Sequence, residues 1–251
     1  MKIAVLQSPS AAGDLDWAFA QLTDALNAAG AAGAAVLVAP EVYLPGYNYD
    51  HIPAMAQPKT RDWLNRLSSL CRDANCGLVI GYAERDGTQT FNSAVAITSN
   101  GDQIAHYRKL QLYGPREAAI YNPGDAYCTF DLNGTKAALL ICYDIEFAPH
   151  VAALRDLGAS LILVPTANMA PFTHVAAHTV PAMAANYALT IAYANYCGSE
   201  GDLAYVGGSL IAGPHGEVLA QAGTGPALLI VELPAADPAR LSTQANDYRK
   251  V

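Results

Sequence analysis

The sequence predicts a mixed α/β (α+β) fold in which helices cover layers of β-sheet. Three observations predict it. Short apolar segments alternate with amphipathic, helix-like stripes in the first half of the chain. Asn-Gly pairs, which favour tight hairpin turns, separate neighbouring extended segments. No linker, repeat or low-complexity tract divides the 251 residues. We therefore expect a single domain over 1–251, with a polar tail from about residue 234.

Composition excludes several classes of protein. Charged residues make up 14% of the chain and hydrophobic residues 52%, so the chain is expected to bury a large core rather than remain disordered. The net charge of −8 argues against nucleic acid or an anionic membrane as a partner. Because the surface is poor in charge, part of it is expected to be buried in a homo-oligomer.

The termini, cysteines and histidines indicate a cytoplasmic protein without a metal. The N-terminus has no signal-peptide pattern, and no apolar run approaches the ~20 residues of a membrane span. The five cysteines are odd in number and form no CxxC pair, as expected in a reducing compartment. His174 and His178 lie four residues apart, but no third ligand is evident.

The first half is expected to hold two helices between strands. Asp14 or Asp16 can cap the first helix, which Gly30 and Gly33 end, and Thr60 can cap the second. Strands are expected at residues 3–6, 34–39, 77–82, 91–98 and 103–108. The last two of these strands form a hairpin through Asn100-Gly101.

The second half is expected to continue with hairpins and two further helices. Asn133-Gly134 joins strands 127–132 and 136–141, and Pro181 should kink or restart a helix. The helices are expected at residues 149–157 and 175–187, and the later strands at 160–164, 190–196, 209–212, 217–221 and 227–233.

Three of the predicted strands end at a reactive side chain: Glu41, Lys109 and Cys142. Ligands bind at the carboxyl ends of strands in α/β sheets, so these ends are expected to meet in one crevice. Taken alone, Cys142 is more typical of a core residue, and Glu41 of a loop carboxylate that reaches solvent. Together they supply a base, a cation and a nucleophile. A following helix N-terminus would favour the thiolate.

Three blocks of sequence resemble the catalytic blocks of the nitrilase superfamily of carbon–nitrogen hydrolases, in the same order and at similar separations. The blocks are Pro40-Glu41 with Gly46-Tyr47-Asn48, Tyr107-Arg108-Lys109-Leu110, and Ile141-Cys142-Tyr143-Asp144. The resemblance extends from the first strand to about Leu233. It implies an α-β-β-α sandwich that dimerises through its sheet-flanking helices into larger assemblies, and it implies no metal or organic cofactor.

The resemblance also implies a role for each residue. Glu41 would be the general base, and Cys142 the nucleophile that forms a thioester. Lys109 and the backbone N–H of Tyr143 would stabilise the tetrahedral intermediates. Glu117 matches the second glutamate of amidases in this family; the alternative is an exposed glutamate paired with its neighbour in the loop.

The residues after Cys142 indicate which branch the chain resembles. Tyr143-Asp144 looks like amidases and carbamoylases, and longer runs resemble 5-aminopentanamidase and R-stereoselective amidases. The expected substrate is a small aliphatic amide, including an ω-amino amide, which water converts to the acid and ammonia. Candidate substrate-binding residues are Tyr47, Tyr113, Tyr143, Asp144, Glu146, Asn168 and Met169. Asp144 and Glu146 could instead cap a helix.

Three alternatives stay open at this point. The same site could hydrolyse a nitrile or an N-carbamoyl amino acid. A different class is a non-catalytic or redox-sensing protein on the same fold, with Cys142 as an oxidisable thiol.

Overall fold

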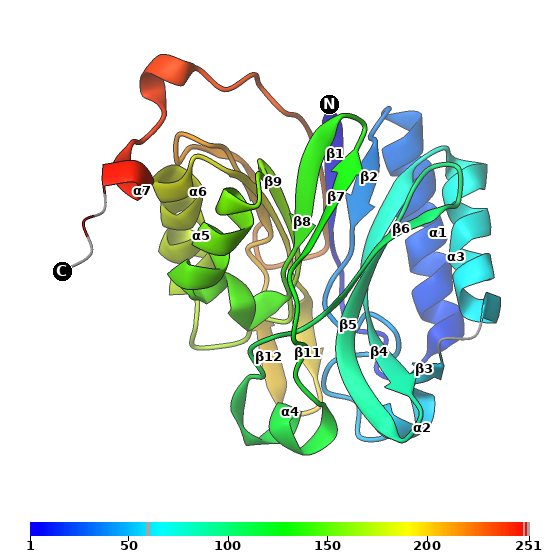
Figure 1. The fold of residues 1–251 in the computed structure, drawn as a ribbon. Coiled ribbons are helices and arrows are strands. Elements are labelled where there is room, and N and C mark those ends of the chain that lie inside the picture. Colours follow the sequence, from blue (N-terminus) through cyan, green and yellow to red (C-terminus); the bar gives the residue numbers. More distant parts are fainter. Residues whose placement is uncertain (59–60, 248, 250–251) are drawn as a thin grey trace.

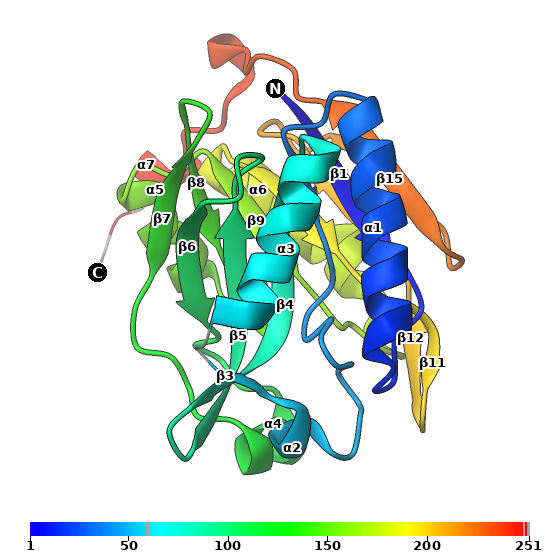
Figure 2. The same cartoon turned by 90° about the vertical axis from the view of Figure 1, so that its right-hand side faces the viewer.

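A computed structural model, which describes residues 1–58, 61–247 and 249, has two sheets that face each other between two layers of helices (Figure 1). Helices α1 (Leu15–Ala31) and α3 (Arg61–Ala74) cover the outer face of one sheet (Figure 2). Helices α5 (Ala148–Asp156) and α6 (Val180–Tyr187) cover the other. The expected α-β-β-α arrangement is confirmed.

The first sheet has seven strands in the order β15-β1-β2-β4-β5-β6, with β3 beside β4. Its strands are β1 (Lys2–Gln7), β2 (Val36–Val38), β3 (Gln57–Pro58), β4 (Gly77–Asp86), β5 (Gln89–Ile97), β6 (Gln103–Arg108) and β15 (Ala227–Glu232). Strands β1, β2 and β4 are parallel, and two antiparallel steps return the chain through β5 to β6. Strand β6 therefore ends at the same edge as β2.

The second sheet has six strands in the order β14-β13-β10-β9-β8-β7. They are β7 (Cys128–Leu132), β8 (Thr135–Leu139), β9 (Leu161–Pro165), β10 (Thr190–Ala194), β13 (Leu210–Ala212) and β14 (Val218–Gln221). Strands β8, β9 and β10 are parallel. Both predicted Asn-Gly hairpins, β5–β6 and β7–β8, form.

Two apolar cores hold these layers together. One lies between the sheets and extends under α5 and α6, and the other lies between the first sheet and helices α1 and α3. Cys71 and Cys76 belong to the second core, as their positions in the apolar pattern predict. Each fully buried Leu or Ile side chain stabilises the fold by roughly 1.5–3 kcal/mol. A shift in strand register would move such side chains out of the core, so the apolar runs that form the strands also fix their register.

Capping residues and prolines in the sequence predict where several helices begin and end. The Asp14 carboxylate accepts a hydrogen bond from the backbone N–H of Trp17, at 2.9 Å, and caps α1. Gly30 lies inside this helix rather than after it. The predicted restart near Pro181 is confirmed, because a π-helical turn at Val175–Thr179 precedes α6. The predicted cap Thr60 lies outside the described residues.

Five helices and strands were not predicted: the helices α2 (Ile52–Met55) and α4 (Gly114–Ile120), the strand β3, and the hairpin strands β11 (Cys197–Glu200) and β12 (Leu203–Val206). These segments are short and lack a clear apolar period, which is the signal that sequence analysis uses. After Cys142 the chain first makes a 3-10 turn, Cys142–Glu146, and α5 then begins one residue earlier than expected.

The tail after β15 is only loosely helical. It contains a 3-10 turn, Pro238–Arg240, and the short helix α7 (Gln244–Asp247), which lies against the α5–α6 side of the molecule (Figure 1). Over the described ranges of the chain, none of the helices combines the length and the apolar character that crossing a membrane requires.

Candidate active site

The three reactive strand ends meet at one edge of the facing sheets. Glu41 follows β2, Lys109 follows β6, and Cys142 follows β8 of the second sheet. The backbone N–H of Glu41 donates to the carbonyl oxygen of Thr166, which follows β9, at 3.2 Å. This bond ties the end of one sheet to the end of the other, so residues from both sheets share one site.

A glycine allows the strand beside Glu41 to approach closely. A Cβ atom at Gly81 in β4 would lie 2.6 Å from the Cα of Glu41, closer than real side chains pack. The backbone N–H of Gly81 instead donates to the carbonyl oxygen of Pro40 at 3.2 Å. Only glycine permits this approach, which fixes where the Glu41 carboxylate lies.

Lys109 lies between two carboxylates. Its Nζ donates to Oε1 of Glu41 and to Oε1 of Glu117, each at 2.7 Å. The Lys109 and Glu41 side chains are fully buried, and that of Glu117 is 2% exposed. The pKa of Lys109 is raised well above its usual value, because the charges of Glu117 and Glu41 outweigh the opposing effect of burial. The lysine is therefore a fixed cation.

Glu117 is held by α4 and by its neighbours. Its Oε1 also accepts a hydrogen bond from the Tyr47 hydroxyl at 2.7 Å, and its Oε2 accepts one from the Tyr113 N–H at 2.8 Å. The alternative of an exposed loop glutamate is therefore wrong.

Glu41 has one oxygen occupied and one free. Asn92 of β5 donates to Oε1 at 2.7 Å, beside the bond from Lys109. Oε2 is buried without a hydrogen-bond partner among the described residues. Burial raises the pKa of Glu41 to about 7, and the charge of Lys109 only partly opposes this. A buried carboxylate with a pKa near neutrality and a free oxygen can accept a proton.

Asn92 was not identified from the sequence. The signal available was a polar residue inside the otherwise apolar run of β5, where it is fully buried. A buried amide requires a hydrogen-bonding partner, and here that partner is Glu41.

Cys142 occupies a sharp turn between β8 and the following 3-10 helix. Its backbone φ is +46°, a conformation that residues other than glycine rarely adopt and that is often retained at functional sites. Burial raises the pKa of its thiol well above the usual value, and the charge of Glu41 adds to this effect. Burial and the charge of Glu41 therefore oppose the thiolate that a helix N-terminus would favour. A base that removes the thiol proton would overcome this effect.

A cavity of about 200 Å³ opens onto Cys142. The lining residues are Tyr47, Tyr113, Cys142, Tyr143, Glu146, Asn168, Met169, Phe172 and His174. Six predicted substrate-binding residues lie here, and Phe172 and His174 are additions that no strand-end pattern indicates. The ring of Tyr113 packs edge-on against Tyr143 and Phe172, with centroids 5.3 and 6.0 Å apart.

Asp144 does not line this cavity. Its carboxylate accepts hydrogen bonds from the backbone N–H groups of Ile141 and Gln111, at 3.0 and 2.7 Å, and from the Tyr107 hydroxyl at 2.8 Å. It is fully buried, and burial raises its pKa. The structure thus places it beneath the Cys142 turn, as the helix-capping alternative predicts, rather than against the substrate.

The described residues contain no group of three or more His, Cys, Asp or Glu side chains that could hold a metal ion. His174 lines the cavity, and the sequence pairs it only with His178.

Comparison with known proteins gives sequence relatives along most of the chain. A "Hydrolase in pqqF 5'region" from Pseudomonas protegens is 40% identical over 205 residues, covering 80% of this chain and 72% of the relative. An "(R)-stereoselective amidase" from Pseudomonas sp. is 33% identical over 250 residues, covering 99% of this chain and 89% of the relative.

Solved structures of similar proteins share the fold. The NitN amidase from Nesterenkonia sp. AN1 superposes with a TM-score of 0.91 at 35% identity, over 99% of this chain and 96% of that chain. In a variant of that amidase, acrylamide has added to the active-site cysteine. The carbon–nitrogen hydrolase family model matches residues 2–241. The chain therefore belongs to the carbon–nitrogen hydrolase family, within the nitrilase superfamily.

Proposed function

We propose that this protein is an amidase that hydrolyses the terminal carboxamide of a small aliphatic amide, through a thioester on Cys142. One observation carries the proposal. Lys109 and Asn92 occupy Oε1 of Glu41, while Oε2 is buried without a hydrogen-bond partner among the described residues, and the charge of Glu41 acts on the nearby Cys142 thiol. The similar proteins named amidases support the same reaction.

In the first half-reaction Glu41 takes the thiol proton as sulfur attacks the carbonyl carbon. The carbonyl oxygen becomes an oxyanion, which Lys109 and the backbone N–H of Tyr143 stabilise. The tetrahedral intermediate then collapses and the C–N bond breaks. Glu41 returns the proton to the leaving nitrogen, so ammonia departs and a thioester remains.

Water completes the cycle. Glu41 takes a proton from a water molecule, whose oxygen attacks the thioester carbonyl. The second oxyanion uses the same stabilising groups as the first. Collapse breaks the C–S bond, the proton returns to sulfur, and the carboxylic acid leaves. Throughout, Glu117 keeps the Lys109 ammonium in place through its 2.7 Å bond.

Glu146 suggests which small amides the cavity accepts. Its half-buried side chain lines the cavity, and no hydrogen bond within the described part of the chain uses its carboxylate. Burial raises the pKa of Glu146, and its interaction with His174 of the same cavity only partly opposes this. A carboxylate that faces a cavity without a hydrogen bond favours a cation on the ligand. An ω-amino amide would carry its ammonium toward Glu146 while its carboxamide lies at Cys142.

Glu146→Gln tests this selectivity. We expect KM for an ω-amino amide to rise roughly 10-fold, the loss of one charge-assisted contact worth about 1.4 kcal/mol. KM for the uncharged aliphatic amide of equal length should change less than twofold. The measurement is ammonia release from both amides by wild type and variant. Equal effects on the two substrates would remove the assigned role of Glu146 in cation recognition.

The same assay separates the alternatives. Matched amide, nitrile and N-carbamoyl substrates should release ammonia fastest from the amide, and faster turnover of the nitrile would overturn the proposal. A redox sensor needs an accessible thiol of low pKa. The cavity makes Cys142 accessible, but the pKa of its thiol is raised, which disfavours that role.

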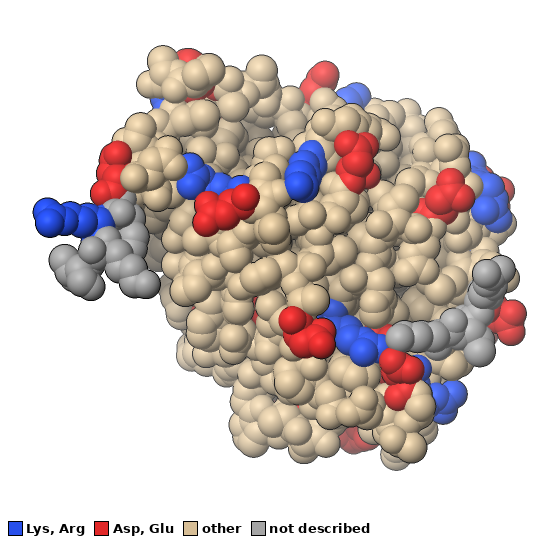
Figure 3. All heavy atoms as spheres, viewed as in Figure 1, with Lys and Arg blue, Asp and Glu red and all other residues tan. Residues whose placement is uncertain are grey.

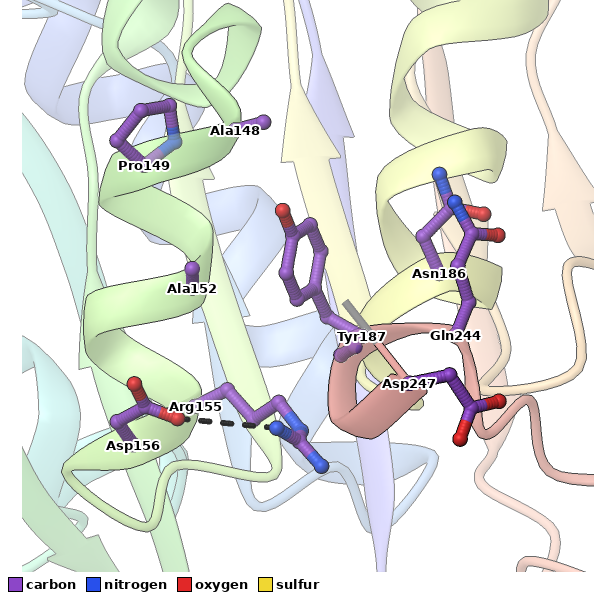
Figure 4. Close-up of a pocket in the computed structure, with 10 residues that line it drawn as sticks. Ala148, Pro149, Ala152, Arg155, Asp156, Asn186, Tyr187, Gln244 and Asp247 are labelled. Carbon is purple, nitrogen blue, oxygen red and sulfur yellow. Dashed lines mark ion pairs between the residues drawn. The ribbon is translucent and has the colours of Figure 1, made fainter. Parts of the chain in front are cut away.

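We also propose a homo-oligomer that uses the α5–α6 side of the molecule. On the face shown in Figure 3, charged side chains are scattered and wide uncharged areas separate them. Helices α5, α6 and α7 frame an open groove there, with Ala148, Pro149 and Ala152 on one wall and Tyr187 on the other (Figure 4). Such a face is expected to be covered in an assembly.

Light scattering checks the assembly. Wild type should elute as a dimer or larger species, and Ala152→Arg should shift it toward the monomer, because a charge would be buried at the interface. Ala126→Arg, in another surface hollow, serves as the control and should leave the mass unchanged. A wild type that is monomeric at micromolar concentration would contradict this proposal.

A cytoplasmic location is consistent with the cysteines. All five thiols are free, and Cys71, Cys76, Cys142 and Cys197 are buried. Free thiols persist in reducing compartments, which supports the cytoplasm as the place of action.

A further inference from the structure

The β11–β12 hairpin, absent from our expectations, lies at the lower end of both sheets in Figures 1 and 2, on the side of the active site. Its two strands form a separate two-stranded sheet, and Tyr205 of β12 also makes an isolated antiparallel bridge with Met169. A short exposed hairpin of this kind is marginally stable alone. Its contacts with the rest of the chain therefore decide what it does.

One side of the hairpin holds the segment that carries Tyr47. Oε2 of Glu200 accepts a hydrogen bond from the backbone N–H of Asn48 at 2.9 Å, and the Glu200 carbonyl oxygen accepts one from Asn48 Nδ2 at 2.8 Å. Asn48 Nδ2 also donates to Asp202 at 2.9 Å. Both the main chain and the side chain of the residue after Tyr47 are thus fixed.

The other side of the hairpin holds a second wall of the cavity. The backbone N–H of Val206 donates to the carbonyl oxygen of Asn168 at 3.2 Å, and the N–H of Ala170 donates to Ala204 at 2.8 Å. Asn168 and Met169, which line the cavity, lie in this segment. The hairpin therefore connects two walls of the active site that are more than 100 residues apart in sequence.

Glu200 is the buried polar centre of this connection. Its side chain is 4% exposed, and its Oε2 also accepts a bond from the Tyr205 hydroxyl at 2.6 Å. A Cβ atom at Gly46 would lie 2.5 Å from Oε1, so the turn at Gly46 is shaped around this carboxylate. Within the described ranges, Oε1 has no hydrogen-bond partner.

From the turn at Gly46, a chain of hydrogen bonds continues through Tyr47 to the reacting groups. Tyr47 stands between Gly46 and Asn48, and its hydroxyl donates to Oε1 of Glu117, the same oxygen that accepts from Lys109. A shift of the turn moves the Tyr47 hydroxyl. The carboxylate that positions the lysine would then lose one of its bonds.

We propose that Glu200 is a positioning residue for the amidase reaction: by fixing the Gly46–Asn48 turn it sets Tyr47 against Glu117 and so aligns Lys109. This inference rests on the proposed function. Glu200 lies outside the cavity lining and acts through Tyr47 rather than on the substrate. Misplacing a stabilising group by about 1 Å can cost roughly 100-fold in rate.

Glu200→Gln tests the role, because the bonds from Asn48 and Tyr205 both end on Oε2, and a neutral amide oxygen accepts them more weakly than a carboxylate oxygen. We expect kcat to fall roughly 10- to 100-fold with KM changed less than about threefold, since the loss is felt in the transition state. The control is Glu232→Gln, the same change on an exposed side chain of β15 outside this link, which should lower kcat less than twofold.

A double-mutant cycle separates positioning from a general loss of structure. In the Tyr47→Phe background, Glu200→Gln should lower kcat by less than about twofold, because the link is already broken. Full additivity of the two losses would overturn the proposal. If Glu200→Gln does not fold, Tyr205→Phe removes the other bond to the same oxygen, and the same cycle and criterion apply.

A second readout does not depend on hydrolysis. The rate at which acrylamide alkylates Cys142, followed by intact mass, should fall at least fivefold in Glu200→Gln and stay within twofold in Glu232→Gln. An unchanged alkylation rate in Glu200→Gln overturns the positioning role. A wild type that is alkylated at Cys142 but hydrolyses no amide overturns the proposed function instead, so the two failures are distinguishable.

Discussion

Cys142→Ala should abolish amide hydrolysis, with a fall in kcat on the order of 10⁴-fold or more, because the thioester cannot form without sulfur. The fold should be retained, since alanine is smaller than cysteine and accepts the same backbone. Ammonia release measures the activity, and thermal unfolding checks the fold. Cys128→Ala, the control, changes a thiol on β7 outside the cavity and should keep full activity.

The same variant tests the intermediate. Wild-type protein mixed with a slowly hydrolysed amide should gain the mass of one acyl group, and peptide mapping should place that group on Cys142. The Cys142→Ala protein should gain none. An acyl group mapped to another residue would reassign the nucleophile, and an alanine variant with normal turnover would end the covalent mechanism.

The parts of the site that the sequence predicts are those set by local patterns. Apolar runs end just before Glu41 and Cys142, and the Asn100-Gly101 turn identifies the strand that ends at Lys109. Parallel strands bring their carboxyl ends to one edge of a sheet, which accounts for the meeting of Glu41 and Lys109. Cys142 joins them because the second sheet packs against the first.

The remaining features depend on contacts between distant segments. Asn92 bonds to Glu41 across 51 residues, and Glu200 bonds to Asn48 across 152. No local period encodes such pairs. The charge state of Cys142 shows the same limit: the helix N-terminus favours a thiolate, but burial and the neighbouring Glu41 favour the thiol, and only the assembled site shows which effect is larger.

Asp144 and Glu146 illustrate this point at close range. Two carboxylates that are two residues apart look equivalent in the sequence. The 3-10 turn directs Asp144 under the strand end, where three donors bind it, and directs Glu146 to the cavity. Their separate tasks follow from the turn geometry rather than from residue type.

Glu41→Gln should lower kcat by roughly 10²- to 10⁴-fold, the usual worth of a general base. The amide retains an oxygen that can accept from Lys109 and Asn92, so the site should keep its shape. It cannot, however, take a proton from the thiol or from water. Ammonia release gives the rate, and binding of substrate by the inactive variant shows that the cavity is preserved.

The pH dependence makes this test specific. Since the pKa of Glu41 is raised to about 7, the carboxylate is protonated below that pH and cannot accept the thiol proton. In wild type, kcat/KM should therefore fall about tenfold per pH unit below the pKa, and the residual rate of Glu41→Gln should lack this acid limb. The variant should also have a lower thiol pKa than wild type, because the charge of Glu41 raises the pKa of Cys142.

A wild-type protein that keeps full activity at pH 5 would mean that another group receives the proton. If Glu41→Gln loses turnover although its Cys142 thiol ionises more easily, then the role of Glu41 is to transfer the proton. Electrostatic activation of the thiolate by Glu41 would not explain that result.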